Sequence, residues 1–377
     1  MTETPHLGVG LIGAGFMGRT HAFAFRNVAR IFALPCTVEL ELLADATDAL
    51  AAQAAASLGF RRATGDWRAL IADPAVHIVA ITTPNTLHRE MALAAIAAGK
   101  HVYCEKPLAP TAAEAREMAE IADRAGVVTA VGFNYLKNPM LALARDIIAS
   151  GEIGEVRDFT GIHAEDYMAD ADAPWTWRLD PAGGGGALAD IGSHIIATAR
   201  YLLGPIRSVQ GDVATAITSR PVARGASERR PVAVDDIARA HIRFASGATG
   251  TLEANWIATG RKMRHDFEVS GSTGALAFSQ ERFNELRLYH TDDAEGRRGF
   301  RTILAGPEHP PYGAFCVAGG HQLGFNDLKT IEVHDLLRAI ADEATGHADF
   351  REGLAVAEVI EAIYQSAREQ RWVNVEG

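Results

Sequence analysis

Cysteines are scarce in this chain and lie far apart. Only three occur among the 377 residues, Cys36, Cys104 and Cys316, and no two of them form a CxxC pair. Disulfide frameworks and thiolate metal sites require paired or clustered cysteines, so the sequence indicates neither. Histidine is more abundant, with 14 residues, but no HExxH motif and no tight group with aspartate accompanies it. We therefore predict reduced cysteines and no catalytic metal.

Long apolar runs and basic clusters are equally scarce. No apolar run reaches the roughly 18 residues that a membrane span needs, and no terminal stretch has the pattern of a signal peptide. The net charge is -11, and the basic run at residues 224–230 is short. Nucleic-acid partners are held by clustered Lys and Arg, so we expect none. The chain is predicted to be globular and cytoplasmic, and its length favours two domains.

A glycine-rich turn is the first motif that indicates a ligand. Residues 7–12 (LGVGLI) are typical of a buried parallel strand, and GAGFMG follows at residues 13–18. In such a turn Gly13 allows the tight bend, Gly15 lets a pyrophosphate approach the backbone, and Gly18 allows close packing of helix on strand. A plain turn without a ligand is the alternative. The predicted dinucleotide-binding residues here are Gly13, Gly15, Phe16, Met17 and Gly18.

Asp45 follows the second predicted strand, residues 37–44. Its carboxylate can accept hydrogen bonds from the ribose hydroxyls of an adenosine and would repel a 2'-phosphate, which favours NAD over NADP. The distance from the glycine loop exceeds the usual spacing of about 20 residues, and we attribute this to a crossover lengthened by residues 26–36. The alternative is that Asp45 caps the start of a helix.

Strand and helix patterns alternate up to residue 131 and predict a doubly wound parallel sheet. The expected strands after the second are 76–83, 100–104 and 127–131, and the expected helices are 86–98 and 111–126, the latter with a capping box from Thr111 and Glu114. From residue 132 onward a helix begins near Pro139, and period-2 segments at 155–163, 206–217, 235–245, 249–257 and 266–278 predict a β-rich domain. Helical periodicity returns at 327–344 and at 352–370, the last helix packing back on the rest. The predicted domains are residues 1–131 and 132–377.

The apolar segment 187–203 is predicted to be a helix with Asp190 and His194 on one face, because they are four residues apart. Two titratable groups on a buried face require a reason. One reading is that both meet a substrate, which the glycines at 183–186 would let approach the backbone. The other is that Asp190 caps the helix and His194 is an ordinary core histidine.

Four stretches together resemble one family, the Gfo/Idh/MocA oxidoreductases. They are GAGFMG at 13–18, TTPNTLH at 82–88, GKHVYCEKPLA at 99–109 and GGGALADIGSHIIATARYLLG at 184–204. The resemblance covers essentially the whole chain. It implies an α/β protein with an N-terminal Rossmann domain, a C-terminal α/β domain with an open, predominantly antiparallel sheet, and an active site between them. It also implies a homo-oligomer, a dimer or tetramer that pairs through the open sheet face.

The resemblance also implies roles for individual residues. Lys106 would touch the nicotinamide ribose and the reacting oxygen, and Glu105 and Pro107 would shape the cofactor loop. Asp190 and His194 would face the hydroxyl that is oxidised. His194 suits a general base and Lys106 suits a stabiliser of the alkoxide, although the lysine itself is an alternative base. The residues expected to line the cofactor groove are Thr83, Pro84, Asn85 and His88.

The expected reaction is the NAD-dependent oxidation of a secondary alcohol on a cyclic polyol or sugar. WTWR at 175–178 and the stretch 319–333 look most like inositol and L-glucose dehydrogenases of that family, with levoglucosan dehydrogenases close behind, so scyllo-inositol or L-glucose is the predicted substrate type. Trp175 and Trp177 fit either a sugar-stacking wall or ordinary packing. The alternatives are an NAD-dependent glycosidase on the same fold and a non-catalytic sugar or NAD sensor. The predicted substrate-binding residues are Asn134, Tyr135, His163, Asp166, Tyr167, Trp177, Arg178, Asp190, His194 and His321.

Overall fold

The computed structural model describes residues 5–183, 185–343 and 345–376. The chain divides into two compact units. Unit 1 comprises Met1–Lys137 and Gly324–Leu354, and unit 2 comprises Asn138–Leu323 and Ala355–Gly377. These units differ from the predicted ranges 1–131 and 132–377 in two ways: the first boundary lies at residue 137, and the segment 324–354 belongs to unit 1 although it comes late in the sequence.

Unit 1 contains a six-stranded parallel sheet, as the alternating pattern predicted. The strand order is β3-β2-β1-β4-β5-β6, so the chain reverses its direction of travel across the sheet between β1 and β4. Such a switch point is where open α/β sheets bind ligands, outside the carboxyl ends of the strands. The strands are β1 His6–Ile12, β2 Thr37–Ala44, β3 Arg62–Thr64, β4 Ile78–Ile81, β5 His101–Cys104 and β6 Thr129–Val131.

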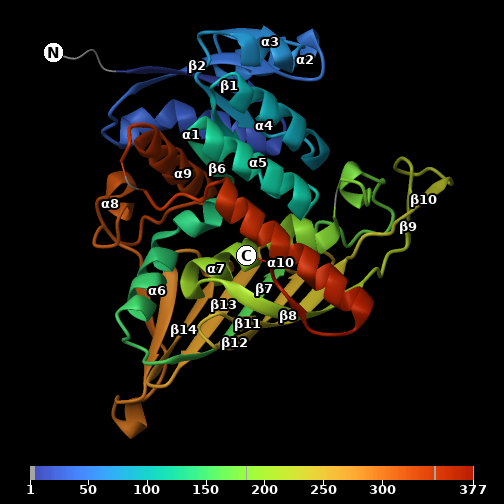
Figure 1. Cartoon of the computed structure of the whole chain (residues 1–377). Coiled ribbons are helices and arrows are strands. Elements are labelled where there is room, and N and C mark those ends of the chain that lie inside the picture. The colour runs from blue at the N-terminus through green and yellow to red at the C-terminus, as the bar shows by residue number, and fades with distance from the viewer. Residues whose placement is uncertain (1–4, 184, 344, 377) are drawn as a thin grey trace. The chain divides into compact units, whose positions relative to one another are not determined.

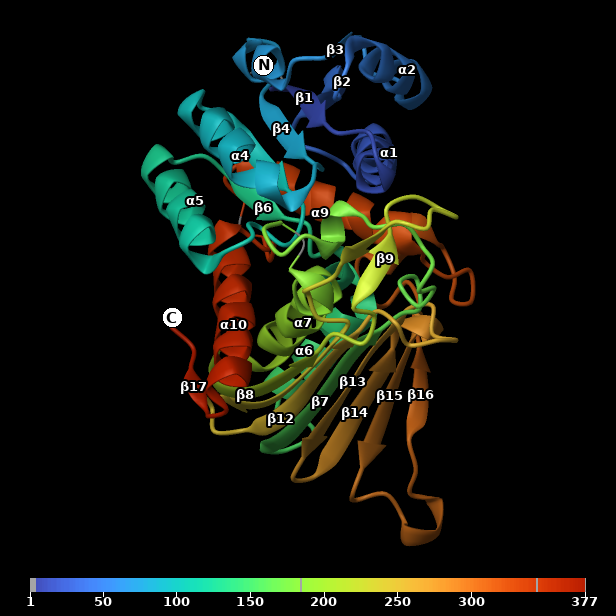
Figure 2. The same cartoon turned by 90° about the vertical axis from the view of Figure 1, so that its right-hand side faces the viewer.

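Helices cover both faces of this sheet. Figure 2 shows α1 on one side and α4 and α5 on the other. The predicted capping of α5 is confirmed: the Thr111 side chain accepts the Glu114 N–H, and Gly126 ends the helix in the left-handed conformation. The helices of unit 1 are α1 Phe16–Ile31, α2 Asp48–Leu58, α3 Trp67–Ala72, α4 His88–Ala97, α5 Ala112–Ala125 and α9 Phe325–Ile340, with 3-10 turns η1 Asn85–Leu87 and η2 Asn134–Lys137.

Helix α9 joins unit 1 because its apolar side completes that core. It lies beside α1, from which most of the sequence separates it (Figure 1). Val333, Leu336 and Leu337 of α9 are fully buried in the same cluster as Val9 and Leu43 of the sheet. Sequence order placed this helix in the second domain, but burial of apolar surface favours the partner that it fits, whatever the distance along the chain.

Unit 2 is built on a nine-stranded sheet in the order β16-β15-β14-β13-β7-β12-β11-β8-β17. Every neighbouring pair is antiparallel except β7 with β12, which confirms the predicted, mostly antiparallel sheet. The predicted segment 266–278 is in fact two strands, because the chain reverses at Ser272 and Thr273. The strands are β7 Val156–Ala164, β8 Ile206–Ala214, β11 Ile237–Phe244, β12 Thr249–Asn255, β13 Arg264–Gly271, β14 Gly274–Ser279, β15 Glu285–His290, β16 Arg301–Leu304 and β17 Val373–Asn374, and β9 Ser219–Pro221 pairs separately with β10 Arg229–Pro231.

Helices α6 and α7 lie on one face of the large sheet (Figure 2). On β11 the exposed side chains Arg239, His241 and Arg243 alternate with buried ones, which is the pattern of a strand with one solvated face. The predicted pairing of subunits through the open face stays a prediction. The helices are α6 Pro139–Ala149, α7 Ser193–Leu203, α8 Tyr312–Phe315 and α10 Phe350–Glu369, whose first turn belongs to unit 1, with shorter turns η3 Trp177–Leu179, η4 Leu188–Gly192, η5 Gln280–Arg282 and η6 Glu295–Arg297. No helix within the described ranges is long and apolar enough to cross a membrane.

Candidate active site

The glycine loop has the geometry that its sequence predicted. Gly13 has a φ of +93°, and a Cβ on Gly18 would lie 2.1 Å from the Gly13 carbonyl oxygen, so the turn and the close packing of α1 both require glycine. At Gly15 a Cβ would meet no described atom within 4 Å beyond its chain neighbours. Phe16 is 72% exposed and stacks on Phe325 of α9. The loop therefore presents open backbone at the start of α1, as a pyrophosphate requires.

Asp45 is held against this loop. Its Oδ2 accepts the Ala14 N–H at 3.0 Å, and its Oδ1 accepts the Ala46 N–H at 2.7 Å. Helix α2 is capped by Thr47, whose side chain accepts the Leu50 N–H, so Asp45 is not its cap. Each carboxylate oxygen keeps a second lone pair, which is the donor-accepting chemistry that ribose hydroxyls need.

A hollow of about 540 Å³ lies beside Asp45. Arg19, Gln53 and Ser57 are the polar side chains that line it together with Asp45, and they were not predicted from the sequence. No sequence motif marks these residues, because they occupy ordinary positions within the helices α1 and α2. The volume is in the range of small-molecule sites and fits an adenosine moiety. The lining residues are Ala14, Arg19, Asp45, Leu50, Gln53, Ala54, Ser57 and Leu58.

His88 joins two loops at the carboxyl edge of the sheet. Its Nδ1 lies 3.1 Å from the Pro107 carbonyl and its Nε2 lies 3.0 Å from the Thr83 carbonyl, and the ring is fully buried. Burial lowers the pKa of His88, although hydrogen bonding to these carbonyls acts in the opposite direction. Both ring nitrogens are thus occupied by protein groups. His88 thus links the loops at residues 83 and 107, and its place in the cofactor groove stays a prediction.

The remaining predicted residues of this edge surround the ends of β4 and β5. Asn85 is buried at the start of η1, after Pro84. Glu105 is buried directly after β5, whereas the Lys106 that follows it is partly exposed. Lys106 thus lies at the carboxyl edge of the parallel sheet, the edge at which open α/β sheets bind ligands.

In unit 2, Asp190 does not lie in a regular α-helix. The predicted helix 187–203 begins as a π-helical turn, η4, and becomes α-helical only from Ser193. The predicted helix is therefore not α-helical throughout, and that Asp190 and His194 share one face stays a prediction. Such turns are rare and occur frequently at functional sites.

The Asp190 side chain accepts hydrogen bonds from two residues that precede it in the sequence. Its Oδ2 accepts the Tyr167 hydroxyl at 2.7 Å and the Arg178 Nε–H at 3.1 Å. It therefore does not serve as a helix cap. The Arg178 guanidinium also lies 4.6 Å from the centre of the Trp177 ring. The structure thus places two of the predicted substrate residues, Tyr167 and Arg178, on the Asp190 carboxylate, with Trp177 beside Arg178.

The other predicted substrate residues have different partners. Asp166 is engaged by the Lys262 ammonium at 2.7 Å. Trp175 packs against Arg230 and donates its indole N–H to the Pro231 carbonyl, which favours the packing interpretation for this tryptophan. His321 is exposed, with its Nδ1 3.0 Å from the Ala318 carbonyl. In unit 1, Tyr135 is buried in η2, and the buried Asn134 Nδ2 has no hydrogen-bond partner among the described residues, which suits a ligand contact.

His194 belongs to a cluster of three histidines. Its ring centre is 5.6 Å from that of His163 and 6.5 Å from that of His265, and the last two rings are fully buried. His163 Nε2 lies 2.9 Å from Glu165 Oε1, and His163 Nδ1 lies 3.2 Å from His265 Nδ1. Both ring nitrogens of His163 are thus engaged within the protein, so its predicted direct contact with substrate is not what the geometry favours.

This cluster was not visible in the sequence. His163 and His265 face each other across the antiparallel pair β7 and β13, and that register exists only in the folded sheet. His265 Nε2 further lies 2.9 Å from the Thr198 hydroxyl of α7. Within the parts of the chain that the structure describes, no group of three or more His, Cys, Asp or Glu side chains is arranged to hold a metal ion.

The Asp235 side chain binds the backbone at the start of η4. Its Oδ2 accepts the Leu188 N–H at 2.9 Å and its Oδ1 accepts the Tyr364 hydroxyl at 2.6 Å. A Cβ on Gly186 would lie 2.1 Å from Asp235 Oδ1, so this glycine is required by the protein's own packing, and Gly185 and Gly186 both have a φ of +68°. Gly184 of the predicted glycine run lies outside the described residues.

The Asp235 carboxyl and a backbone carbonyl both lie close to the hydroxyl of Tyr364. The Tyr364 hydroxyl is within hydrogen-bonding distance of both the Gly185 carbonyl and Asp235 Oδ1, and a phenol has one proton to donate. A proton on Asp235 would satisfy both contacts. Burial raises the pKa of Asp235 to about 6, although hydrogen bonds from Tyr364 and Leu188 lower it.

Replacing Asp235 by Asn should therefore change how stability depends on pH. A carboxyl with a pKa of about 6 when folded and 3.8 in its ordinary state gives stability at low pH that is lost as the pH rises through this interval. Asp235→Asn has no such titration. Its unfolding free energy relative to the unchanged protein should rise by up to about 3 kcal/mol between about pH 4 and pH 7, measured by urea unfolding at each pH. The exposed Asp212→Asn is the control, and a pH-independent difference for Asp235→Asn would contradict the assignment.

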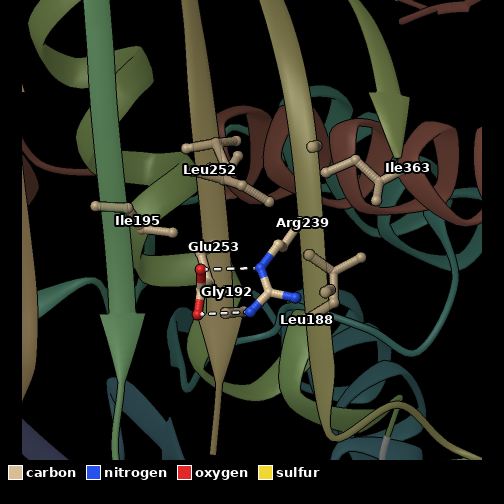
Figure 3. A pocket seen from close by; sticks show the side chains of 11 residues that line it. Leu188, Gly192, Ile195, Arg239, Leu252, Glu253 and Ile363 are labelled. Atoms are coloured by element: carbon tan, nitrogen blue, oxygen red, sulfur yellow. Dashed lines mark hydrogen bonds and ion pairs between the residues drawn. The ribbon is translucent and has the colours of Figure 1, made fainter. Parts of the chain in front are cut away.

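A small, mostly apolar void under η4 is not a substrate site. Figure 3 shows Leu188, Ile195, Leu252 and Ile363 around it, with Arg239 and Glu253 paired at the strands β11 and β12. Its volume of about 10 Å³ is near the minimum for one water molecule. A sugar therefore cannot bind there, and the void marks only where η4 and α7 rest on the sheet.

Two family models match the chain. The model of the oxidoreductase family with an NAD-binding Rossmann fold matches residues 7–133, and the model of the GFO/IDH/MocA C-terminal domain matches residues 141–277. The first match confirms the predicted NAD-binding Rossmann domain, within which the glycine loop and Asp45 lie.

Individual relatives extend the similarity to the whole chain. Levoglucosan dehydrogenase from Pseudarthrobacter phenanthrenivorans is 40% identical over 383 aligned positions, which cover 98% of each chain. A solved structure of levoglucosan dehydrogenase in complex with NADH and levoglucosan is 41% identical, with a TM-score of 0.95 over 99% of this chain and 100% of that one. An NAD binding oxidoreductase from Klebsiella pneumoniae is 46% identical, with a TM-score of 0.93 over 99% of each chain. On these matches, and on the glycine loop and nine-stranded sheet described above, the chain belongs to the Gfo/Idh/MocA family of oxidoreductases.

Proposed function

We propose that this protein is an NAD-dependent dehydrogenase that oxidises a secondary alcohol of a cyclic sugar or polyol. The observation that carries the proposal is the polar cluster on Asp190. A carboxylate in a π turn holds a phenol and a guanidinium, and the buried His194 follows one turn later. These are groups that recognise hydroxyls and accept a proton, and they occur in a chain whose other unit is an NAD-binding domain.

The residues of the NAD-binding domain fit this cofactor. The Asp45 carboxylate is pre-oriented by two backbone amides, and the start of α1 offers open backbone at Gly15. Asp45 would accept the ribose hydroxyls and the loop amides would bind the pyrophosphate. When bound, NAD would accept a hydride from the carbon that bears the hydroxyl.

The chain's own side chains would handle the proton and the developing charge. His194 would take the hydroxyl proton as a neutral imidazole, and Asp190, held by Tyr167 and Arg178, would orient the alcohol and favour the imidazolium that forms. The Lys106 ammonium would stabilise the alkoxide, because a fixed positive charge helps most where negative charge develops. The Trp177 ring would offer a flat apolar face to the sugar ring.

The substrate type follows from two different sources. The motifs at 175–178 and 319–333 favour scyllo-inositol or L-glucose, whereas a relative that is 40% identical over 98% of this chain is a levoglucosan dehydrogenase. All three are six-membered rings with several hydroxyls. We propose a hydroxylated six-membered ring as the substrate class, with levoglucosan as the first compound to test.

A substrate panel tests this proposal. The protein would be mixed with NAD and with levoglucosan, L-glucose, scyllo-inositol or myo-inositol, and NADH formation would be followed by absorbance. We expect steady NADH accumulation with at least one ring compound and a kcat/KM at least about tenfold above that for the others, which is the discrimination that a few differently placed hydroxyls supply. A parallel series with NADP in place of NAD measures the cofactor preference.

The alternatives give different results in the same panel. A glycosidase that uses NAD transiently would cleave an aryl glycoside without net NADH, and a sensor would bind a sugar or NAD without turnover. Either result would overturn the proposal. Saturation of the rate by one sugar at micromolar to millimolar concentration would support it.

A further inference from the structure

A buried network of charged side chains includes Glu105, the residue that precedes Lys106 in the cofactor loop. It joins three segments of unit 1 that are distant in sequence, namely α1, the end of β5 and helix α9. The exposed fraction of every member is 5% or less. We call it the Glu105 network, and its members are His21, Tyr103, Glu105, Lys329 and Glu332.

Lys329 is the centre of this network. Its ammonium has three N–H groups, and three acceptors surround it: the Tyr103 hydroxyl at 3.0 Å, Glu105 Oε1 at 3.0 Å and Glu332 Oε2 at 2.8 Å. Tyr103 in turn donates its hydroxyl to Glu332. Every donor of the ammonium is therefore used, and its position is fixed from three sides.

Glu105 receives a second donor from α1. His21 Nε2 lies 2.7 Å from Glu105 Oε1, and burial lowers the pKa of His21 to about 4, so the ring is neutral and donates its single N–H to the carboxylate. Burial opposes ionisation of Glu105, but the Lys329 ammonium and His21 together hold its pKa below the usual value. The ion pair of Glu105 and Lys329 thus persists inside the protein.

A buried ion pair of this kind contributes little to stability. The cost of desolvating both charges is comparable to their attraction, and apolar residues of similar size often stabilise a protein equally well. The pair does restrict geometry. The Glu105 N–H donates to the Ile81 carbonyl, and the carboxylate fills the space above Gly132, where a Cβ would lie 2.6 Å from Oε1. Glu105 is therefore clamped by its backbone and by its side chain.

This clamp acts on the next residue, Lys106. The Glu105 Oε2 accepts the backbone N–H of Lys106 at 3.3 Å, so the main chain at position 106 is tied to the same carboxylate. We propose that Lys329, through Glu105, is a positioning residue for Lys106. This inference rests on the proposed function, in which Lys106 meets the alkoxide. Errors of about 1 Å at such a group cost on the order of 10²-fold in rate.

The test removes the central ammonium and keeps its aliphatic stem. Lys329→Met should lower kcat at least about tenfold and change the Kd of NAD by less than about threefold, because the loop is displaced while the glycine loop and Asp45 are untouched. The primary deuterium isotope effect on kcat should rise as the chemical step slows. Lys137→Met is the matched control, since it also deletes a buried ammonium that pairs with α9, at Asp335, and contacts no member of the Glu105 network in the described residues.

A double-mutant cycle separates positioning from general destabilisation. In a Lys106→Ala background, Lys329→Met should change the residual rate by less than about twofold, because Lys329 acts through the side chain that is already gone. A purely structural role would give the same loss in both backgrounds. Acetylation of Lys106 by a small anhydride, followed by peptide mass spectrometry across pH, gives a readout without turnover: its rate should change in Lys329→Met and stay the same in Lys137→Met.

A variant without buried charges guards against misfolding. If Lys329→Met does not fold, Glu105→Gln/Lys329→Met/Glu332→Gln removes the three buried charged groups that meet at the ammonium and should fold, yet remain slow. Wild-type kcat in either folded variant, or equal losses in both backgrounds, would overturn the positioning role. Failure of the proposed function is a separate result, because the unchanged protein would then form no NADH with any sugar of the panel.

Discussion

Lys106→Ala and His194→Ala should each lower kcat/KM for the ring substrate by at least about 10³-fold while NAD binding stays within about threefold of the unchanged protein. The lysine supplies charge stabilisation and the histidine supplies proton transfer, and each such contribution is commonly worth about 10²- to 10⁴-fold. Steady-state rates and fluorescence titration with NADH measure the two quantities. His241→Ala, on the exposed side of β11, is the control and should leave the rate unchanged.

Arginine at position 106 decides which group is the base. Lys106→Arg keeps a positive charge but cannot give up a proton at neutral pH. If His194 is the base, this variant should retain more activity than Lys106→Ala, and its rate should still fall at acidic pH as the imidazole becomes protonated. If Lys106 is the base, the two variants should be equally inactive. Near-normal rates in Lys106→Ala and His194→Ala would refute the assigned roles of both residues.

Asp45→Ser should change cofactor preference by at least about 10²-fold toward NADP, because like-charge contacts with a phosphate cost several kcal/mol. Removing the carboxylate also deletes an acceptor for the ribose hydroxyls, so activity with NAD should fall. Arg19 lines the same hollow and would then be available to a 2'-phosphate. The ratio of kcat/KM for the two cofactors measures the effect.

The matched control for this change is Asp66→Ser. Asp66 caps α3 in the same unit, and serine retains capping capacity, so the variant alters charge equally without touching the hollow. Its cofactor ratio should equal that of the unchanged protein. An unchanged ratio in Asp45→Ser would show that the carboxylate does not meet the ribose.

Much of the fold was predictable because local patterns and global structure agree. The strand 37–44, the Thr111 cap and the glycine loop were each read from short segments, and each is determined by neighbours within a few residues. Where a local pattern had two meanings, the sequence could not choose. Asp45 was compatible with a helix cap and with a ribose contact, and the structure excludes the cap because Thr47 caps α2.

Other features could not be predicted from the sequence. Helix α9 was assigned to the wrong unit, because only packing shows that Val333 and Leu337 complete the core around the parallel sheet. The π turn at Asp190 also lacks a simple sequence pattern, and its first residue, Leu188, donates its N–H to Asp235, which is distant along the chain. Both involve partners that are remote along the chain.

The amino-acid sequence by itself determined the family, the parallel sheet with its NAD-type loop, and the identities of Lys106, Asp190 and His194 as candidates. Tertiary structure alone decided what surrounds them: Tyr167 and Arg178 on Asp190, the histidines beside His194, and Lys329 behind Glu105. Motifs are read from residues close in sequence, whereas hydrogen bonds and ion pairs form between residues close in space. The environment that tunes a functional group therefore appears only once the chain has folded.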